Sequence, residues 1–214
     1  MQYLKAFSVI VAITKNRGIG IQGQMGWRLK QEMQQFKITT STTTHPTKQN
    51  AVIMGRKTWE SLQGRALPSR INIIITRQPT FVQLKENCHA FGSLDTALEF
   101  LSKKKVDKIF VIGGGEIYAQ ALKHKMCTEL LVTQLLEDRK SDTFFPAIPP
   151  VFECVFVSAV QTELDMIEKQ AISYQYQRWL RVESNHVKMV NIVETIIRWC
   201  ESCWTCLFGN MYAL

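Results

Sequence analysis

Residues 108–118 read KIFVIGGGEIY, and this stretch indicates how the chain folds. Four of its first five residues are apolar, which is typical of a buried strand. The strand runs straight into Gly113, Gly114 and Gly115, and we expect a helix over 116–122. Glycines let a backbone approach a diphosphate, and a helix N-terminus offers free N–H donors. The spacing is not G-x-G-x-x-G, so a tight structural turn explains the glycines equally well.

The same alternation of strand and helix continues on both sides of this stretch. We expect strands at 7–14, 51–54, 71–76 and 88–91, and helices at 27–37, 56–62 and 94–102. Three strands without intervening helices follow, at 130–136, 152–160 and 172–180. The pattern predicts an α/β fold with a mixed, mostly parallel central sheet, helices on both faces and antiparallel C-terminal edge strands.

A second glycine lies at the end of a predicted strand. Met54-Gly55-Arg56-Lys57-Thr58 places a glycine, two cations and a hydroxyl after residues 51–54. It is not a Walker A motif, because the first glycine and the spacing are missing. Two such turns on one sheet indicate a nucleotide whose phosphates bind at two places.

One carboxylate stands out in the predicted helix at 27–37. Leu29, Met33 and Phe36 follow at helical spacing, and Glu32 borders this apolar stripe. A carboxylate beside an apolar wall resists ionisation and favours an amide-like or cationic partner. Such a group can help to move a proton. The alternative is a solvated glutamate paired with Arg28 or Lys37.

Composition narrows the class of protein. The chain has 214 residues and a formal net charge of +8. The basic residues are dispersed apart from 103–105, which favours small anionic ligands over a nucleic-acid surface. The apolar run at 7–13 is far shorter than the roughly 20 residues of a membrane span and lacks signal-peptide anatomy. We therefore expect a cytoplasmic protein without a membrane span. Separately, we interpret Cys88, Cys127 and Cys154 as buried thiols, because each lies in or beside a predicted apolar element.

The ordered set of motifs over about residues 5–180 resembles the dihydrofolate reductase family. The matching segments are Val11-Ala12, Gly18-Ile19-Gly20, Trp27, Glu32, Phe36-Lys37, VIMGRKTWES at 52–61, Arg70-Ile71-Asn72, Thr76-Arg77, Ser93-Leu94-Asp95, Ile112-Gly113-Gly114, Tyr118 and DTFFP at 142–146. The resemblance implies reduction of 7,8-dihydrofolate to tetrahydrofolate with NADPH as cofactor.

The resemblance also implies roles for single residues. Glu32 would grip the pterin edge and support its protonation, Thr133 would steady Glu32, and Trp27 would lie beside the site. Arg70 would clamp the α-carboxylate of the substrate, a role that suits its planar fork. The remaining substrate contacts would come from Val11, Ala12, Met33, Phe36, Leu62, Leu67, Ile112 and Tyr118. Without the resemblance, Arg70 reads equally well as a surface arginine before a strand.

The cofactor would contact a larger set of residues. The resemblance places its phosphates at Arg56, Lys57, Thr58, Thr76 and Arg77 and its nicotinamide end at Gly113 and Gly114. The further cofactor contacts would be Ala12, Ile19, Gly20, Gly55, Gly115 and Glu116. The family usually joins the glycines at 113 and 114 by a cis peptide. Gly92 stands where many relatives carry a polar residue, which leaves the 2′-phosphate to Arg56 and Arg77. No metal is expected.

Residues 181–214 match nothing in the family. Their apolar residues follow helical spacing, so we expect a C-terminal extension with an amphipathic helix beside a reductase domain at 1–180. Cys200, Cys203 and Cys206 have metal-site spacing without a clear fourth ligand. A related pterin or riboflavin-pathway reductase is the alternative enzyme, and an RNA-binding relative, with its own mRNA as partner, is the alternative from another class. We expect a monomer.

Overall fold

The computed structural model describes residues 4–79 and 87–182. The strands are β1 (Phe7–Ile13), β2 (Gly18–Gly20), β3 (Gln49–Gly55), β4 (Arg70–Ile75), β5 (Cys88–Phe91), β6 (Val106–Gly113), β7 (Cys127–Leu135), β8 (Thr143–Phe144), β9 (Phe152–Val157), β10 (Gln161–Leu164) and β11 (Ala171–Arg181). The helices are α1 (Lys30–Ser41), α2 (Arg56–Ser61), α3 (Leu94–Ser102) and α4 (Gly115–Lys123).

Most strands of the main sheet run parallel. The order is β10-β11-β7-β1-β6-β3-β4-β5, and β9 pairs with β11 outside this path. The pairs from β7 through β5 are parallel, whereas β11 is antiparallel to β7, β9 and β10. The predicted mixed sheet with an antiparallel C-terminal edge is therefore confirmed.

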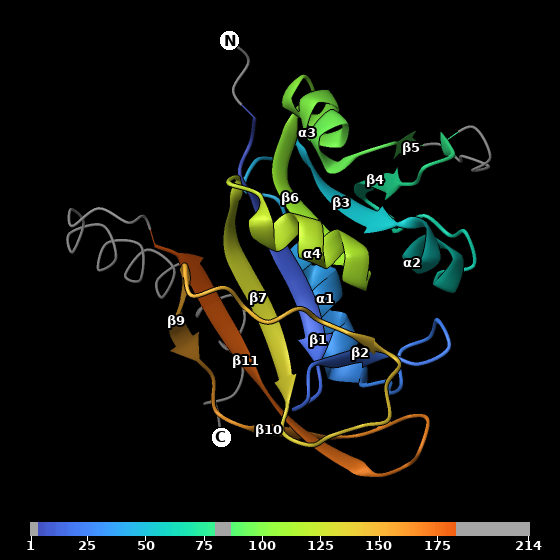
Figure 1. The fold of residues 1–214 in the computed structure, drawn as a ribbon, viewed down its shortest axis with the longest axis vertical. Helices are drawn as coiled ribbons and strands as arrows, with labels where there is room; N and C mark the ends of the chain where they lie inside the picture. Colours follow the sequence, from blue (N-terminus) through green and yellow to red (C-terminus); the bar gives the residue numbers. More distant parts are fainter. Residues whose placement is uncertain (1–3, 80–86, 183–214) are drawn as a thin grey trace. The chain divides into compact units, whose positions relative to one another are not determined.

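Helices cover both faces of this sheet, because strands buried on both sides need an apolar partner on each. α3 and α4 pack on the face that carries Val9, Val11 and Ile13. α2 packs with Val52, Met54 and Phe110 on the other face, and α1 lies on that face too, since its Glu32 reaches Thr133 of β7. Figure 1 shows α4 in front of the sheet and α1 behind it.

The helix predicted at 27–37 begins and ends later than its sequence indicates. It spans Lys30–Ser41, Trp27 and Arg28 lie before it outside any helix, and the N-cap residue Leu29 has extended backbone. The Arg28 N–H donates to the Asp165 carboxylate, and the Arg28 carbonyl accepts from the Met166 N–H. Neither backbone group is therefore free to join a helix. At the other end, Asn50 Nδ2 donates to two carbonyls of the last turn, which extends the helix past 37.

Several smaller expectations are also settled. The predicted helix at 94–102 is present as α3, and the Ser93 side chain caps it by accepting a hydrogen bond from Thr96 N. Cys88 and Cys127 are buried, but Cys154 is exposed on the edge strand β9, so the expectation of a buried thiol was wrong there. The predicted tail helix and Cys200, Cys203 and Cys206 lie outside the described residues.

Candidate active site

The carboxyl ends of the parallel strands meet at one edge of the sheet, where ligands of α/β folds usually bind. Met54 of β3 pairs in register with Gly113 of β6, which places both glycine turns side by side. A Cβ on Gly114 would lie 3.3 Å from the Thr58 hydroxyl, and one on Gly55 would lie 3.7 Å from the Gly113 carbonyl oxygen. The two glycine motifs of the sequence therefore form one continuous site.

Glu32 lies at the start of α1 and faces the sheet. Its side chain is 8% exposed, and the Thr133 hydroxyl donates to its Oε1 at 3.1 Å. Burial raises the pKa of Glu32 to about 7, although the Thr133 hydrogen bond opposes this and the nearby charge of Glu163 adds to it. No ion pair reaches Glu32 within residues 4–79 and 87–182, so the solvated alternative paired with Arg28 or Lys37 is excluded.

Arg70 is the first residue of β4 and lies beside the last turn of α1, at the end of this helix opposite to Glu32. Its side chain is 4% exposed, its Nη1 donates to Thr40 Oγ1 at 2.6 Å and its Nε donates to the Pro68 carbonyl at 2.9 Å. Burial lowers its pKa, yet an arginine stays charged. Among the described residues no carboxylate pairs with it. A buried cation with only neutral protein partners is suited to an anionic ligand.

The side chains between these two ends are mostly apolar. Leu62, Leu67 and Ile112 are partly buried against the α2 side of the sheet, and Phe36 is half-buried on α1. Met33 is 43% exposed. The stripe of Met33 and Phe36 therefore faces the open side of the site and not the core.

Strand alternation corrects one predicted contact and adds another. Val11 packs under α3 and α4 on the opposite face of the sheet, so its side chain does not line this site. Tyr118 belongs to that face as well, but its hydroxyl donates to the Ile10 carbonyl at 3.0 Å. Ile10 and Ala12 share the α1 face with Leu131. The sequence analysis named Ala12 as a site residue and missed Ile10. Ile10 could have been found, because residues two apart on a strand share a face.

The opposite end of the site fits a dinucleotide. α2 and α4 both begin at this edge, and their N-caps Gly55 and Gly114 make no side-chain cap, so N–H groups remain available. The Gly113–Gly114 peptide is cis, as the resemblance implied. Arg56, Lys57 and Arg77 are exposed around this edge, while Thr76 is 7% exposed and its hydroxyl accepts from Gln78 N.

The segment before α1 completes the surroundings. Trp27 is 2% exposed, and its indole Nε1 is buried without a hydrogen-bond partner among the described residues. Gly20 is buried beside Ile19, and a Cβ there would lie 2.6 Å from the Gln24 carbonyl oxygen. Glu116 is exposed in the first turn of α4, so only its backbone N–H suits a phosphate.

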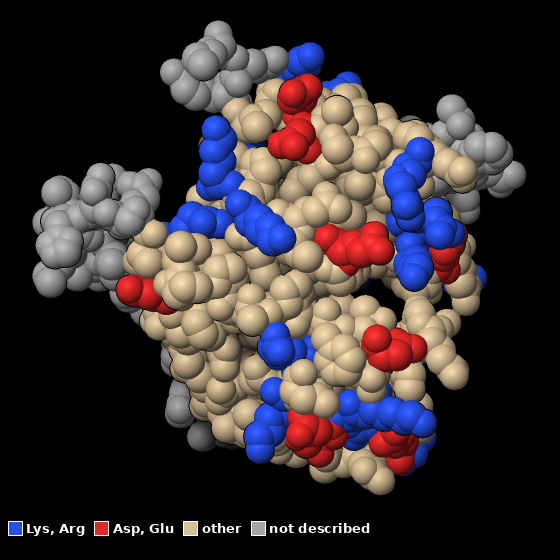
Figure 2. Space-filling view, viewed as in Figure 1, with Lys and Arg blue, Asp and Glu red and all other residues tan. Residues whose placement is uncertain are grey.

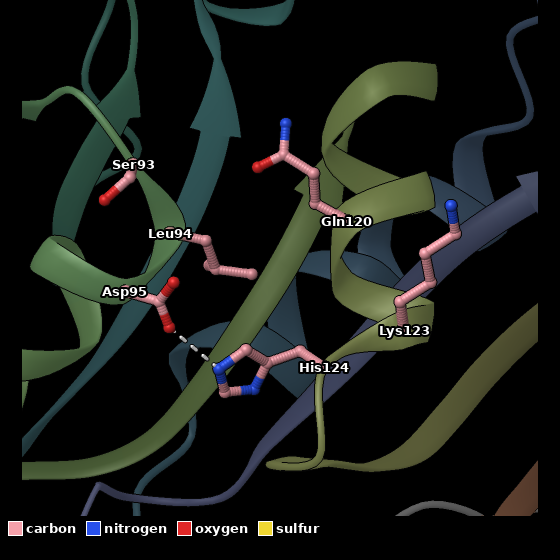
Figure 3. Close-up of a pocket in the computed structure, with 6 residues that line it drawn as sticks. All are labelled: Ser93, Leu94, Asp95, Gln120, Lys123 and His124. Carbon is pink, nitrogen blue, oxygen red and sulfur yellow. Dashed lines mark hydrogen bonds and ion pairs between the residues drawn. The ribbon is translucent and has the colours of Figure 1, made fainter.

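A separate hollow lies away from this site. It has a volume of about 290 Å³ and is lined by Ser93, Leu94, Asp95, Gln120, Lys123 and His124 (Figure 3). His124 Nε2 lies 3.1 Å from Asp95 Oδ1 across it. α3 and α4 form its walls on the face opposite to Glu32, so it belongs to the packing of these helices.

Surface charge and metal ligands point to no other class of site. On the face shown in Figure 2, Lys and Arg lie in separate groups with Asp and Glu among them, without a continuous basic surface. No cluster of metal-ligating side chains occurs within the described part of the chain. None of its helices is long and apolar enough to cross a bilayer.

Comparisons with known proteins agree with this geometry. The family model described as dihydrofolate reductase matches residues 6–181. A dihydrofolate reductase of Drosophila melanogaster is 37% identical over 174 residues, covering 80% of this chain and 95% of that protein. One of Aedes albopictus is 35% identical over 185 residues, covering 84% and 99%.

Longer relatives match as well. A bifunctional dihydrofolate reductase-thymidylate synthase of Daucus carota is 39% identical over 194 residues, which are 87% of this chain and 36% of that protein. The chain thus spans about a third of such bifunctional relatives. The family match over most of the chain and the two insect relatives together show that this chain belongs to the dihydrofolate reductase family.

Proposed function

We propose that the chain reduces 7,8-dihydrofolate to 5,6,7,8-tetrahydrofolate with NADPH and so supplies one-carbon and thymidylate metabolism. The observation that carries the proposal is that Glu32 lies at the start of α1 and Arg70 of β4 lies beside its end. Thr40, which contacts Arg70, is eight residues after Glu32, and a helix rises 1.5 Å per residue, so the two ends of the site are about 12 Å apart. A folate has a ring edge for the acid and a carboxylate for the arginine at its two ends.

The residues of the chain supply a proton and an orientation. Because the pKa of Glu32 is about 7, the group holds its proton for part of the time at neutral pH and can pass it toward the ring. Thr133 fixes the rotamer of Glu32, and Arg70 fixes the distant carboxylate, so the ring cannot slide along the apolar wall. NADPH would supply the hydride.

We propose that the cofactor binds across the joined glycine turns. The N–H groups at the starts of α2 and α4 would hold the diphosphate, and Arg56, Lys57 and Arg77 would surround the 2′-phosphate. Arg56 is paired with Glu60, both about half exposed, so this pair opens at little cost. Gly92 leaves open space where a side chain would otherwise reach the cofactor.

The direct test is loss of NADPH absorbance in the presence of dihydrofolate. We expect turnover with NADPH and much weaker turnover with NADH. Changing both Arg56 and Arg77 to alanine should reduce this preference and leave NADH kinetics almost unchanged, since each charge-assisted bond contributes about 1.5–3 kcal/mol. No oxidation of NADPH by the purified chain would overturn the proposal. An unchanged NADPH-to-NADH ratio in the double variant would place the 2′-phosphate elsewhere.

We further propose that residues 1–180 form the reductase domain of a cytoplasmic monomer, with 181–214 as an extension. β11 ends at Arg181, and residues up to Val182 form one compact unit. A chain ending at Val182 keeps every predicted site residue, so its turnover should stay within about threefold of the full chain. Inactivity of the shortened chain would assign the extension to the reductase itself.

A further inference from the structure

The end of β10 and the turn that follows it reach across to the start of α1, the helix that carries Glu32. Both carboxylate oxygens of Glu163 accept the N–H of Gln31, at 2.8 and 3.0 Å. Asp165 Oδ1 accepts the N–H of Arg28 at 2.7 Å. These acids follow α1 by more than 120 residues in the sequence, so the contacts are purely tertiary.

α1 needs such an acceptor, because it cannot cap itself. Its N-cap residue is Leu29, which has no side-chain acceptor and makes no cap hydrogen bond. Glu32 occupies the third helical position, where an acid often turns back to the N-cap. Here Glu32 turns toward Thr133 instead. Glu163 therefore supplies the acceptor for the second N–H of the helix, which the side chain of the N-cap residue Leu29 cannot supply.

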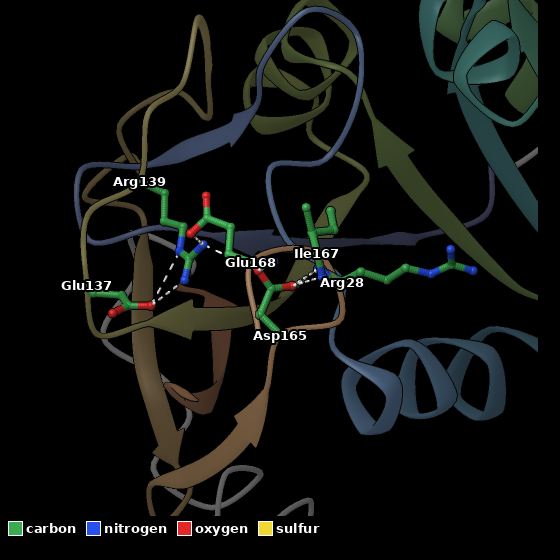
Figure 4. Close-up of polar contacts among 6 residues, drawn as sticks. All are labelled: Arg28, Glu137, Arg139, Asp165, Ile167 and Glu168. Carbon is green, nitrogen blue, oxygen red and sulfur yellow. Dashed lines mark hydrogen bonds and ion pairs between the residues drawn. The ribbon is translucent and has the colours of Figure 1, made fainter. Parts of the chain in front are cut away.

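The turn that follows β10 is itself held firmly. Asp165 is fully buried and also accepts the N–H groups of Ile167 and Glu168, each at 3.2 Å. Arg139 joins Asp165 to Glu137 and Glu168, as Figure 4 shows. Met166 N donates back to the Arg28 carbonyl at 2.9 Å. The backbone just before α1 is thus fixed at Arg28, where both the N–H and the carbonyl make hydrogen bonds.

Glu163 also belongs to the electrostatic surroundings of Glu32. The Tyr174 hydroxyl lies 3.5 Å from Glu163 Oε2, and the rings of Tyr174 and Tyr176 meet edge to face. Burial raises the pKa of Tyr118, Tyr174 and Tyr176, and the charge of Glu32 adds to each shift, so these phenols stay neutral near neutral pH. Glu163 is therefore the charged group that acts on Glu32 here.

We propose that Glu163 is a positioning residue for Glu32: from β10 it caps the start of α1 and so fixes the backbone from which the Glu32 side chain faces the substrate. This inference rests on the proposed function of Glu32. It predicts two separable effects of Glu163. One depends on an acceptor oxygen at this position, and the other depends on its negative charge.

Two variants of the full chain separate these effects. Glu163→Gln keeps an acceptor and removes the charge, whereas Glu163→Ala removes both. Glu153→Ala, an exposed acid on neighbouring β9, is the matched control. We would measure kcat and kcat/KM for dihydrofolate against pH, and titrate Glu32 by carboxyl ¹³C NMR in the absence of substrate.

For Glu163→Gln we expect near-normal kcat at low pH and a Glu32 titration that is lower by about half a pH unit, the size of one partly screened charge. Glu163→Ala should add a loss of kcat of about fivefold, comparable to one lost N-cap, and faster hydrogen exchange at the Gln31 amide. The control should match the wild type in every readout.

The outcomes distinguish this inference from the function on which it rests. An unchanged Glu32 titration and unchanged Gln31 exchange in both variants would overturn the positioning role, even in an active enzyme. Lower stability without a shift in titration would reduce Glu163 to a structural residue and would also overturn it. A wild type without NADPH-dependent turnover would overturn the proposed function, while the NMR and exchange results would still decide the inference. If Glu163→Ala does not fold, Glu163→Gln decides the charge effect.

Discussion

Two buried carboxylates near the start of α1, those of Glu32 and Asp165, have pKa values that are shifted in opposite directions. Glu32 is 8% exposed and receives one hydroxyl donor, from Thr133, and burial raises its pKa to about 7. Asp165 is 0% exposed, and burial alone would raise its pKa too. Hydrogen bonds from Arg28, Ile167 and Glu168, together with the charge of Arg139, outweigh that burial and hold the pKa of Asp165 below its usual range.

The difference shows that the number of donors, more than burial, decides what a buried acid can do. Three backbone N–H groups and a guanidinium keep Asp165 ionised, so it can only hold structure. A single hydroxyl leaves Glu32 able to gain or lose a proton near neutral pH, at a cost in stability. The end of β10 and the turn after it connect the two, because Glu163 and Asp165 hold the backbone at the start of the helix that carries Glu32.

The largest expected effect is on how stability depends on pH. The folded pKa of Glu32, about 7, exceeds the ordinary glutamate value of 4.5. The folded state therefore holds this proton more tightly, and stability falls as the pH rises from 4.5 to 7 and stays lower above that. The loss is roughly 3 kcal/mol for this shift. Urea unfolding between pH 5 and pH 8 should show the fall in the wild type and not in Glu32→Gln.

Asp165 contributes with the opposite sign. Because its folded pKa is depressed, its stabilisation is present above the unfolded value and is lost as the pH falls through the acid range. The two acids therefore act in different pH windows. A wild type whose stability between pH 5 and pH 8 matches that of Glu32→Gln would show that Glu32 is not held protonated.

Glu32→Gln should also lower turnover by at least about 10²-fold near neutral pH, the scale of a lost acid–base group. The amide keeps the shape of the side chain and cannot donate the same proton, so the fold should be unchanged. Loss of NADPH absorbance with dihydrofolate measures the effect, and Glu153→Gln is an exposed control. Turnover like that of the wild type would remove Glu32 from the chemistry.

Asp165→Asn should destabilise the fold by about 2 kcal/mol, since one of its side-chain atoms would become a donor facing other donors. In the structure, Asp165 Oδ2 accepts from Glu168 N and lies 3.4 Å from Arg139 Nη1. The free energy of unfolding from urea titration measures this loss. Turnover per folded molecule should fall less than in Glu32→Gln, and the reverse order would make Asp165 the more important acid for the reaction.

The sequence predicted the parallel part of the fold well and the antiparallel edge less well. β1, β3, β4 and β6 are near-continuous apolar runs, because both faces of a parallel sheet are buried. β10 reads QTEL with half of its residues exposed, and β2 and β8 have three and two residues, so no hydrophobic pattern marks them. Their pairing is decided by neighbours that are distant in sequence.

The candidate site was predictable to a similar extent. The helical pattern singled out Glu32, and the family resemblance named Thr133 and Arg70. The structure places Thr133 against Glu32, and Arg70 of β4 beside the last turn of the helix that carries Glu32. The predicted substrate contact of the Val11 side chain was wrong, because this side chain lies on the opposite face of the sheet. The alternation of side chains along β1 could have indicated this. The start of α1 could not be predicted, because Glu163 at the end of β10 and Asp165 just after it decide where the helix begins.

The smallest expected effect comes from the one hydrogen-bond donor that the Glu32 side chain has among the described residues. The Thr133 hydroxyl stabilises the ionised form of Glu32 and so opposes the effect of burial. Thr133→Val is nearly isosteric and removes this bond, which contributes about 1 kcal/mol. We expect the pKa of Glu32 to rise above its wild-type value and turnover near neutral pH to change by only about fivefold. Carboxyl ¹³C NMR titration and the pH profile of kcat/KM would measure both. The shift should be opposite in sign to that of Glu163→Gln, because one variant removes a donor and the other removes a negative charge. Shifts of the same sign in the two variants would mean that a change in packing around α1, and not these two groups, controls the acidity of Glu32.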